Sequence, residues 1–299
     1  MYRKLFLLFL LQIFLFMGCT GKERTVFEYS YFKEEIKSWD DVFSSPSQIS
    51  LEILKTGEIT VKKSGVINLK SPLMKGVKDE IQKYGMYVYL IFHKKRGYFL
   101  INTGLDSSFY KNPHGKFKGI FAQWHLDDRF SQKESEGIDV QLKNKGIKLQ
   151  GVFLTHLGES LCGVLSLPSD ILYVFGSEEK EPFIYREAIE RLSDIRVLDF
   201  DKAKEISPLG KSIDIFGDGS LWAISTPGYT QGHVSYLLNS LDGPILITGN
   251  ACITRFGFEY GVEPGKNSFN VLLARESLIR LIKFAKMYPK ARIVFGYEI

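Results

Sequence analysis

One short segment near the middle of the chain constrains its fold more than any other. An apolar run at residues 151–154 predicts a buried strand, and that strand ends on the polar pair Thr155-His156. From residue 154 to residue 163 the sequence reads Leu-Thr-His-Leu-Gly-Glu-Ser-Leu-Cys-Gly. A histidine at this point invites comparison with a metal site. One imidazole is too little to hold a catalytic zinc, however, because such a zinc needs three protein ligands and an open position.

The composition indicates a folded, globular body. At 299 residues and 44% hydrophobic, the chain can bury a full core as one large domain or two small ones. Charged residues make up 24% and aromatic residues 14%, and there is no low-complexity tract. The net charge of +5 is mild, and Lys and Arg are spread among acids along the chain. We therefore expect no nucleic-acid partner.

The first residues have the pattern of a targeting segment. A basic start precedes an apolar run at residues 5–17, which is shorter than the roughly 20 residues that a transmembrane helix needs. We predict a signal peptide at residues 1–18. Gly18-Cys19 resembles a bacterial lipobox, in which the cysteine is acylated and becomes the new N-terminus. The two residues before Gly18 are bulkier than usual there, so a plain secretory signal is the alternative.

Export would determine where the protein is found and how its cysteines behave. A lipid on Cys19 would tether the chain to a membrane of the bacterial cell envelope, on the extracytoplasmic side, either periplasmic or at the surface. The remaining cysteines, Cys162 and Cys252, would then be in a compartment where disulfides form. They can be a disulfide or two buried free thiols, and geometry decides between these.

The pattern along the chain predicts one main body after an N-terminal extension. Residues 19–48 are mixed and aromatic, so we expect a tether followed by a segment that packs on a domain at residues 49–299. Short strands are predicted at 51–54 and 59–61, and a hairpin is predicted at 86–92 and 98–101.

Later segments alternate between strand and helix patterns. Residues 126–145 are helix-compatible, and further helices are predicted at 183–192 and 269–287. Additional strands are predicted at 171–175, 195–198, 212–216, 221–225, 234–238, 245–248 and 291–295. Strands first, then strands alternating with helices, favour an α/β fold, a four-layer αββα sandwich.

Several motifs together resemble one known family. Residues 154–163 resemble the central motif T-H-x-H-x-D-H-x-G of the metallo-β-lactamase superfamily. Residues 226–233 resemble its T-P-G-H-T-P-G-H, residues 246–250 its L-x-T-G-D, and residues 294–298 its G-H-[DE]. Residues 216–222 resemble the turn and strand of the lactonase-like branch, the relatives of acyl-homoserine-lactone lactonases. The resemblance spans residues 85 to 299 and implies the αββα fold of that family.

The resemblance also implies a zinc site, but this sequence departs from the motif at almost every ligand position. His156 keeps the family's residue, and Asn102 stands where the family's D-T-G turn has Asp. Residues that the family does not use as ligands occupy the other positions: Gly158, Ser160, Leu161, Tyr229, Asn250 and Tyr297. We therefore expect no metal and no cofactor, although zinc is usual for the fold.

Other uses of the remaining polar groups stay open. His156 with Glu159 can act as a general base, and His156 with Cys162 can form a nucleophile pair. His156, Glu159 and His233 can hold a single metal. Against these stands a buried histidine satisfied by a polar network. Glu159 occupies a variable motif position and is expected to point outward, and His233 is expected to be structural.

These observations favour an extracytoplasmic lipoprotein of this fold that acts as a non-catalytic binding or interaction protein. The old cleft, lined by Tyr229, Tyr297, Leu161 and His156, would form a neutral aromatic pocket for a small ligand or a partner's loop. The alternative is a divergent hydrolase that acts on a lactone or an ester with a metal-free or single-metal site. A structural surface lipoprotein is a third possibility.

Overall fold

The computed structural model describes residues 24–33, 35–127 and 129–299. The predicted signal peptide at residues 1–18 and the predicted lipid attachment at Cys19 lie outside the described residues. Within them, every helix is too short or too polar to cross a membrane. The predicted division at residues 48 and 49 stays a prediction.

The larger sheet combines antiparallel hairpins with a parallel half. Among the described residues, its strands follow the order β1-β8-β7-β6-β4-β3-β2-β5. Strands β4, β6, β7 and β8 are parallel, so their carboxyl ends meet at one edge. The bounds are β1 Thr25–Val26, β2 Ile49–Lys62, β3 Ile81–His93, β4 Gly97–Ile101, β5 Phe130–Ser131, β6 Leu149–Phe153, β7 Leu172–Gly176 and β8 Asp194–Leu198.

The smaller sheet is antiparallel apart from one edge. Its order in the described chain is β14-β13-β12-β11-β10-β9, and β14 runs parallel to β13. The bounds are β9 Lys204–Ile206, β10 Gly210–Asp214, β11 Leu221–Ser225, β12 Val234–Ser240, β13 Gly243–Ile247 and β14 Arg292–Val294.

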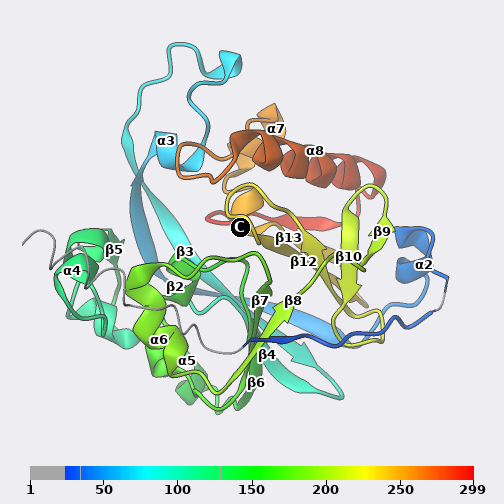
Figure 1. The fold of residues 1–299 in the computed structure, drawn as a ribbon, viewed down its shortest axis with the longest axis horizontal. Coiled ribbons are helices and arrows are strands. Elements are labelled where there is room, and N and C mark those ends of the chain that lie inside the picture. Colours follow the sequence, from blue (N-terminus) through cyan, green and yellow to red (C-terminus); the bar gives the residue numbers. More distant parts are fainter. Residues whose placement is uncertain (1–23, 34, 128) are drawn as a thin grey trace, which may run out of the picture.

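Helices cover the outer face of each sheet. Figure 1 shows α8 along the smaller sheet, and α4, α5 and α6 beside the larger one. The α-helices are α2 Trp39–Phe43, α3 Lys63–Val66, α4 Ile120–Leu126, α5 Ile138–Asn144, α6 Arg186–Glu190, α7 Arg255–Tyr260 and α8 Val271–Met287. The 3₁₀ helices are η1 Pro72–Met74, η2 Ser107–Tyr110, η3 Glu159–Leu161, η4 Val164–Ser166, η5 Phe183–Tyr185 and η6 Gly249–Ala251. The predicted four-layer αββα fold is confirmed.

Apolar contacts between the layers hold the sandwich together. Tyr89, Phe153 and Tyr236 are buried between the two sheets, where the alternating side chains of both sheets meet. Leu281 of α8 packs on the outer face of the smaller sheet beside Trp222. Each large side chain that is fully buried in this way contributes about 1.5–3 kcal/mol relative to exposure.

The segment at residues 24–48 packs on this body. β1 pairs with β8 in parallel register, at the edge of the larger sheet. Trp39 of α2 is fully buried, and its ring meets the ring of Trp222 edge-on at 5.3 Å. An aromatic contact of this geometry fixes the segment to the outer face of the smaller sheet.

Two local predictions were wrong. The strands expected at 51–54 and 59–61 are one strand, β2, because a bulge between Lys55 and Gly57 absorbs the irregularity without ending the pairing with β3. The helix-compatible segment at 126–145 contains the end of α4, then β5, and only then α5. Its polarity reflects exposed loops rather than a continuous amphipathic helix.

Candidate active site

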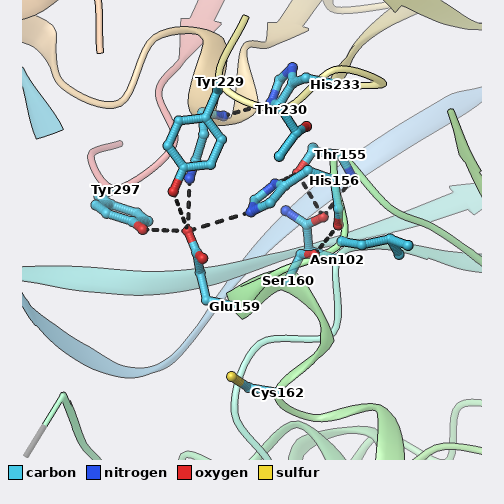
Figure 2. Close-up of polar contacts among 12 residues, drawn as sticks. Asn102, Thr155, His156, Glu159, Ser160, Cys162, Tyr229, Thr230, His233 and Tyr297 are labelled. Carbon is cyan, nitrogen blue, oxygen red and sulfur yellow. Dashed lines mark hydrogen bonds and ion pairs between the residues drawn. The ribbon is translucent and has the colours of Figure 1, made fainter. Parts of the chain in front are cut away.

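The candidate site lies where loops from both sheets converge. His156 follows β6, and Tyr229 lies in the loop between β11 and β12. Asn250 belongs to η6 after β13, and Tyr297 follows β14. The structure brings these side chains around the carboxylate of Glu159, in η3 (Figure 2). Segments far apart in the sequence therefore share one polar centre.

Glu159 is the hub of this centre. Its Oε1 accepts a hydrogen bond from the Tyr297 hydroxyl at 2.6 Å and from Asn250 Nδ2 at 2.8 Å. The Tyr229 hydroxyl donates to the same oxygen at 3.3 Å. The expectation that Glu159 points outward was wrong, because η3 turns the residue inward and leaves it 9% exposed. A carboxylate thus lies at the centre of the side chains that the motif positions contribute.

His156 faces this carboxylate with its Nε2 atom. Nε2 lies 3.5 Å from Glu159 Oε1, an ion-pair distance, and makes no directed hydrogen bond to any residue that the structure describes. Nδ1 lies 2.9 Å from the Thr155 hydroxyl, which itself donates to Asn102 Oδ1 at 3.1 Å. Because the hydroxyl proton goes to Asn102, Nδ1 must carry a proton and donate. A proton on Nε2 as well makes the ring an imidazolium opposite the carboxylate.

The charges of the pair support each other. Burial opposes the charged form of His156, but the charges of Glu159 and Glu179 raise its pKa above the ordinary value. Burial also opposes ionisation of Glu159, whereas the charges of His156 and Arg129 hold its pKa well below the ordinary value. The result is a buried ion pair in which Glu159 stays ionised and His156 stays protonated to a higher pH than a free imidazole.

Asn102 shows why the turn after β4 keeps its shape. The residue has φ 63°, in the left-handed region, which Asn tolerates better than most residues. Its Oδ1 accepts the backbone N–H of Thr155 at 2.9 Å as well as the Thr155 hydroxyl. The side chain therefore ties the turn after β4 to the strand end that carries His156.

His233 has the structural role that we expected. Its Nε2 accepts the backbone N–H of Asn250 at 2.9 Å, and its Nδ1 lies 2.8 Å from the Thr226 hydroxyl. Burial, and then the charge of His156, lower its pKa well below the ordinary value, so the ring is neutral. The rings of His233 and His156 stack at 5.8 Å. His233 does not meet His156 and Glu159 as a third ligand would, because both of its nitrogens are engaged elsewhere.

Glu179 is a residue of this region that the sequence interpretation missed. It lies just after β7 and is 4% exposed. Its carboxylate accepts the Leu157 N–H at 2.8 Å and a hydrogen bond from the Thr230 hydroxyl. Burial raises its pKa, and these hydrogen bonds oppose that effect. The sequence did offer a clue to Glu179. It is an acidic residue shortly after the strand predicted at 171–175, which belongs to the parallel half of the sheet, where strand ends converge.

The other motif residues have structural positions. The Ser160 hydroxyl donates to the His156 carbonyl, and Leu161 is fully buried in the apolar core under the larger sheet. The prediction that Leu161 lines the old cleft was therefore wrong, since its side chain packs into that core. A Cβ added at Gly158 would lie 3.0 Å from His156 Nε2, so the absence of a side chain leaves room for this ring.

The cysteines do not take part in the polar centre. Cys162 and Cys252 are both free and buried, so the disulfide alternative is excluded. Cys162 Sγ lies 3.5 Å from the Tyr185 hydroxyl, and Figure 2 shows Cys162 apart from the side chains around Glu159. Burial raises the pKa of Cys162 to about 12, which keeps it a thiol. The Cys-His nucleophile pair is therefore absent from this centre.

A small cavity adjoins the pair and shares lining residues with a larger groove. Its volume is about 20 Å³, enough for roughly one water, and His156, Glu159, Asn250 and Tyr297 are among its lining residues. Tyr297 also lines an open groove of about 700 Å³. The expected neutral aromatic pocket was wrong on two counts, because the old cleft contains an ion pair and is almost filled.

Comparisons with known proteins agree with this fold. The chain is 27% identical over 262 residues to the N-acyl homoserine lactonase AttM of Azorhizobium caulinodans, covering 84% of this chain and 94% of the relative. An N-acyl homoserine lactone hydrolase, solved with its product at the catalytic metal centre, matches with a TM-score of 0.64 at 21% identity, covering 85% and 95%. AidC, a dizinc quorum-quenching lactonase, matches with a TM-score of 0.55 at 13% identity, covering 85% and 89%. No protein-family model matches the chain.

These relatives correct one prediction. We expected no cofactor because the family's ligands are missing, but solved lactonases of this fold work with a metal centre, in AidC with two zinc ions. That expectation is contradicted and is not retained.

The donor set of this chain still differs from a two-zinc centre. Of the family's ligand positions His156 alone keeps its residue. Across residues 24–299, apart from 34 and 128, no cluster of three His, Cys, Asp or Glu side chains could hold a metal ion. The residues at the family positions therefore do not fit two zinc ions, and no catalytic step is derived through them.

Proposed function

Because the chain is a member of the metallo-β-lactamase superfamily and shares the fold of its lactonases, we propose that it is a divergent hydrolase that acts on a lactone or an ester. The similarity to a lactonase over nearly the whole length of both chains supports this class of reaction. The polar centre lies where the loops of the two sheets converge, and it combines convergent polar groups with pKa values shifted by burial and charge, as functional sites often do.

The observation that carries the proposal is the His156–Glu159 pair beside a cavity for one water. In the proposed reaction Glu159 accepts a proton from that water as its oxygen bonds to the acyl carbon. The imidazolium of His156 and the hydroxyl of Tyr297 stabilise the negative oxygen that forms. The tetrahedral intermediate then breaks the carbon–oxygen bond, and the leaving alkoxide takes the proton from Glu159. A carboxylate with a lowered pKa is a weak base, so we expect slow turnover.

The adjoining spaces suggest what kind of acyl group would fit. The groove beside Tyr297 shares Tyr84 and Phe256 with a pocket of about 370 Å³. Val66, Ile67 and Met74 also line that pocket. An acyl chain would bury apolar surface there, at about 25 cal/mol per Å², while the bond to be cleaved lies at Tyr297. We propose an apolar acyl chain as the part of the substrate that binds this pocket.

The test uses the full-length protein with N-hexanoyl-L-homoserine lactone and a p-nitrophenyl ester as probes. Ring opening or ester cleavage is measured for wild type, Glu159→Gln and His156→Ala. We expect slow turnover in wild type and a loss of about 100-fold or more in each variant, as general acid–base and electrostatic contributions of this size predict. Turnover that is unchanged in both variants would refute the proposed centre.

A matched control separates loss of chemistry from loss of folding. His93 is also a buried histidine paired with a carboxylate, with Nε2 2.9 Å from Asp218 Oδ2, and neither residue lines the cavity. His93→Ala should keep turnover at the wild-type level. Zinc content is measured on the same samples, and turnover is compared before and after dialysis against a chelator. Turnover that follows zinc and ignores Glu159→Gln would assign the reaction to a metal site elsewhere.

A second function is favoured by a specific observation. Glu159 Oε1 already accepts hydrogen bonds from tyrosine hydroxyls and an amide, and the cavity holds about one water. A cavity of this size has no room for an acyl group beside the water, so catalysis requires the lining side chains to move. A non-catalytic protein that binds an apolar ligand or a partner's loop in the groove needs no such movement. Binding of N-hexanoyl-L-homoserine lactone that persists in Glu159→Gln without ring opening would favour this function.

We also propose that the protein is an exported lipoprotein, tethered through Cys19 to a membrane of a bacterial envelope. The apolar run at residues 5–17 and the following Gly18-Cys19 support this. Cells labelled with a radioactive fatty acid should incorporate label into wild type and not into Cys19→Ser. Equal label in both would leave a plain secretory signal as the explanation.

A further inference from the structure

Four large apolar side chains are exposed side by side, away from the polar centre. Ile120, Phe121 and Trp124 of α4 are 74%, 60% and 83% exposed, and Phe183 at the start of η5 is 62% exposed. The rings of Phe121 and Phe183 meet edge-on at 5.5 Å, which joins the two elements into one surface. We call these four residues the aromatic patch.

The arrangement of α4 shows that this exposure is not a frayed end. Ala122 and Leu126, on the opposite face of the helix, are buried in the core under the larger sheet. The helix is therefore docked, and it presents its largest side chains outward. Isolated exposed apolar residues are normal, but a contiguous group that includes Trp and Phe marks a surface with a partner.

The chain enters the fold beside this patch. Arg24, the first described residue, forms an ion pair with Glu181, two residues before Phe183. Cys19 lies five residues before Arg24. Five extended residues span at most roughly 17 Å, so a lipid on Cys19 would hold the membrane within that reach of Arg24. A lipid on Cys19 would therefore attach the chain close to Glu181, two residues before Phe183 of the aromatic patch.

Basic side chains frame the patch. Lys116 and Lys118 precede α4, and all three of Lys116, Lys118 and Arg186 are exposed. The Arg186 guanidinium lies over the Phe183 ring at 5.5 Å. Acids of the surrounding segments include Asp127, which pairs with His114, Glu187, and the buried Asp106, whose carboxylate lies 3.9 Å from Lys116 Nζ. Aromatic rings flanked by Lys and Arg are typical of surfaces that sit at the headgroup level of an anionic membrane.

We propose that the aromatic patch inserts into the headgroup region of the membrane and orients the body on it. This inference rests on the proposed lipid anchor and is independent of the proposed hydrolase activity. A lipid anchor alone restrains the distance from the membrane but leaves the body free to rotate. Trp and Phe side chains at the interface, with basic residues against anionic headgroups, would add the second contact that fixes one face.

The sequence supplies a specific probe for this contact. The chain has three tryptophans, and Trp39 and Trp222 are fully buried, so Trp124 is the one that solvent or lipid can reach. Full-length acylated protein is reconstituted into vesicles of phosphatidylcholine and phosphatidylglycerol that carry brominated acyl chains. Tryptophan emission is then measured against vesicles with unbrominated lipid and, separately, with aqueous iodide.

We expect brominated lipid to quench the Trp124 emission and iodide to leave it largely unquenched. The quenching should disappear in Trp124→Phe, and most of it should be lost in Phe121→Ser/Phe183→Ser. Leu272→Ser, which removes a side chain that is 70% exposed on α8, is the matched control and should retain the quenching. Iodide quenching without lipid quenching would overturn the proposal. Protection from both quenchers that grows with protein density would also overturn it and would indicate a second copy on the patch.

Discussion

Two loops of this molecule resemble family motifs, and they have changed in different ways. The loop after β6 keeps His156 and has lost its neighbouring ligands, whereas the loop between β11 and β12 keeps His233 and exchanges the other histidine for Tyr229. Both histidines are buried, and their rings stack at 5.8 Å. One ring is charged and the other is neutral. Two histidines of one cluster thus differ in their charge.

The surroundings account for this difference. Among the described residues, His156 is the ion-pair partner of the Glu159 carboxylate, so protonation of the ring satisfies both groups. His233 accepts a backbone N–H through Nε2, and this bond requires an unprotonated nitrogen. The charge of His156 then disfavours a second positive ring nearby. Hydrogen bonds to the scaffold hold His233 neutral, whereas His156 forms an ion pair with Glu159, a residue outside the family's ligand positions.

Glu159→Ala should have the largest effect on stability. It removes the counter-charge of His156 and leaves hydroxyls of Tyr229 and Tyr297 without their acceptor. Breaking one side of a buried ion pair lowers the free energy of unfolding by about 3–5 kcal/mol. Urea denaturation followed by circular dichroism would measure this change.

The double variant His156→Leu/Glu159→Leu tests whether the charge is the cause. Replacing both members of a buried pair by apolar residues is often close to neutral, so the double variant should be more stable than Glu159→Ala. If it is equally unstable, the loss comes from packing around Glu159 and not from the charge of His156.

The pair should also make stability depend on pH, and the contribution of His156 should change in the opposite direction to that of His233. The pKa of His156 is raised above 6.5, so its contribution is complete below that pH and is lost as pH rises through the raised pKa. The pKa of Glu159 is lowered below 4.5, so its contribution is complete above that pH and is lost as pH falls through the lowered pKa. The free energy of unfolding of wild type should therefore exceed that of the double leucine variant by the largest amount between pH 4.5 and 6.5. A difference that does not vary with pH would contradict the assigned charges.

His233→Ala should have an intermediate effect. It leaves the buried N–H of Asn250 without an acceptor, which lowers the free energy of unfolding by about 1–3 kcal/mol. His233→Asn should recover part of this loss if its side-chain oxygen reaches the same N–H. The folded pKa of His233 is lowered below the unfolded value of about 6.5, so its contribution to stability is complete above that pH and shrinks as pH falls. The loss in His233→Ala should therefore be smaller at pH 5 than at pH 7, and a loss that is larger at pH 5 would contradict the neutral ring.

Much of the fold could be predicted from the sequence, because it rests on periodicity and on motifs in order. The hairpin of β3 and β4, the long helix α8 and the strand ahead of Thr155 are all local patterns that need no partner to be recognised. β2 was harder, since its bulge at residues 55–57 looks like the end of a strand until β3 is seen beside it. The four-layer arrangement followed from the order of the elements.

The centre of the site could not be predicted in the same way. Glu159 was placed outside because its motif position varies, yet its orientation depends on the turn of η3 and on donors from η6 and from the chain after β14. Glu179 and Arg129 approach the pair from other segments, and nothing in the local sequence links them. Motif comparison reports which ligands are missing. It does not report what fills the space, because that depends on contacts between distant residues.

Tyr229 and Tyr297, which stand where the family motif has histidines, should differ in how much their hydrogen bonds to Glu159 stabilise the fold. Tyr297 donates to Glu159 at 2.6 Å and Tyr229 at 3.3 Å, so the first bond is short and charge-assisted and the second is weak. Tyr297→Phe should lower the free energy of unfolding by about 1.5–3 kcal/mol, and Tyr229→Phe by roughly 0.5 kcal/mol. Parallel urea titrations at pH 6, where the pair is charged, would measure both. Equal losses would mean that the two hydroxyls share the carboxylate evenly, and that the loop between β11 and β12 holds Glu159 as firmly as the chain after β14 does.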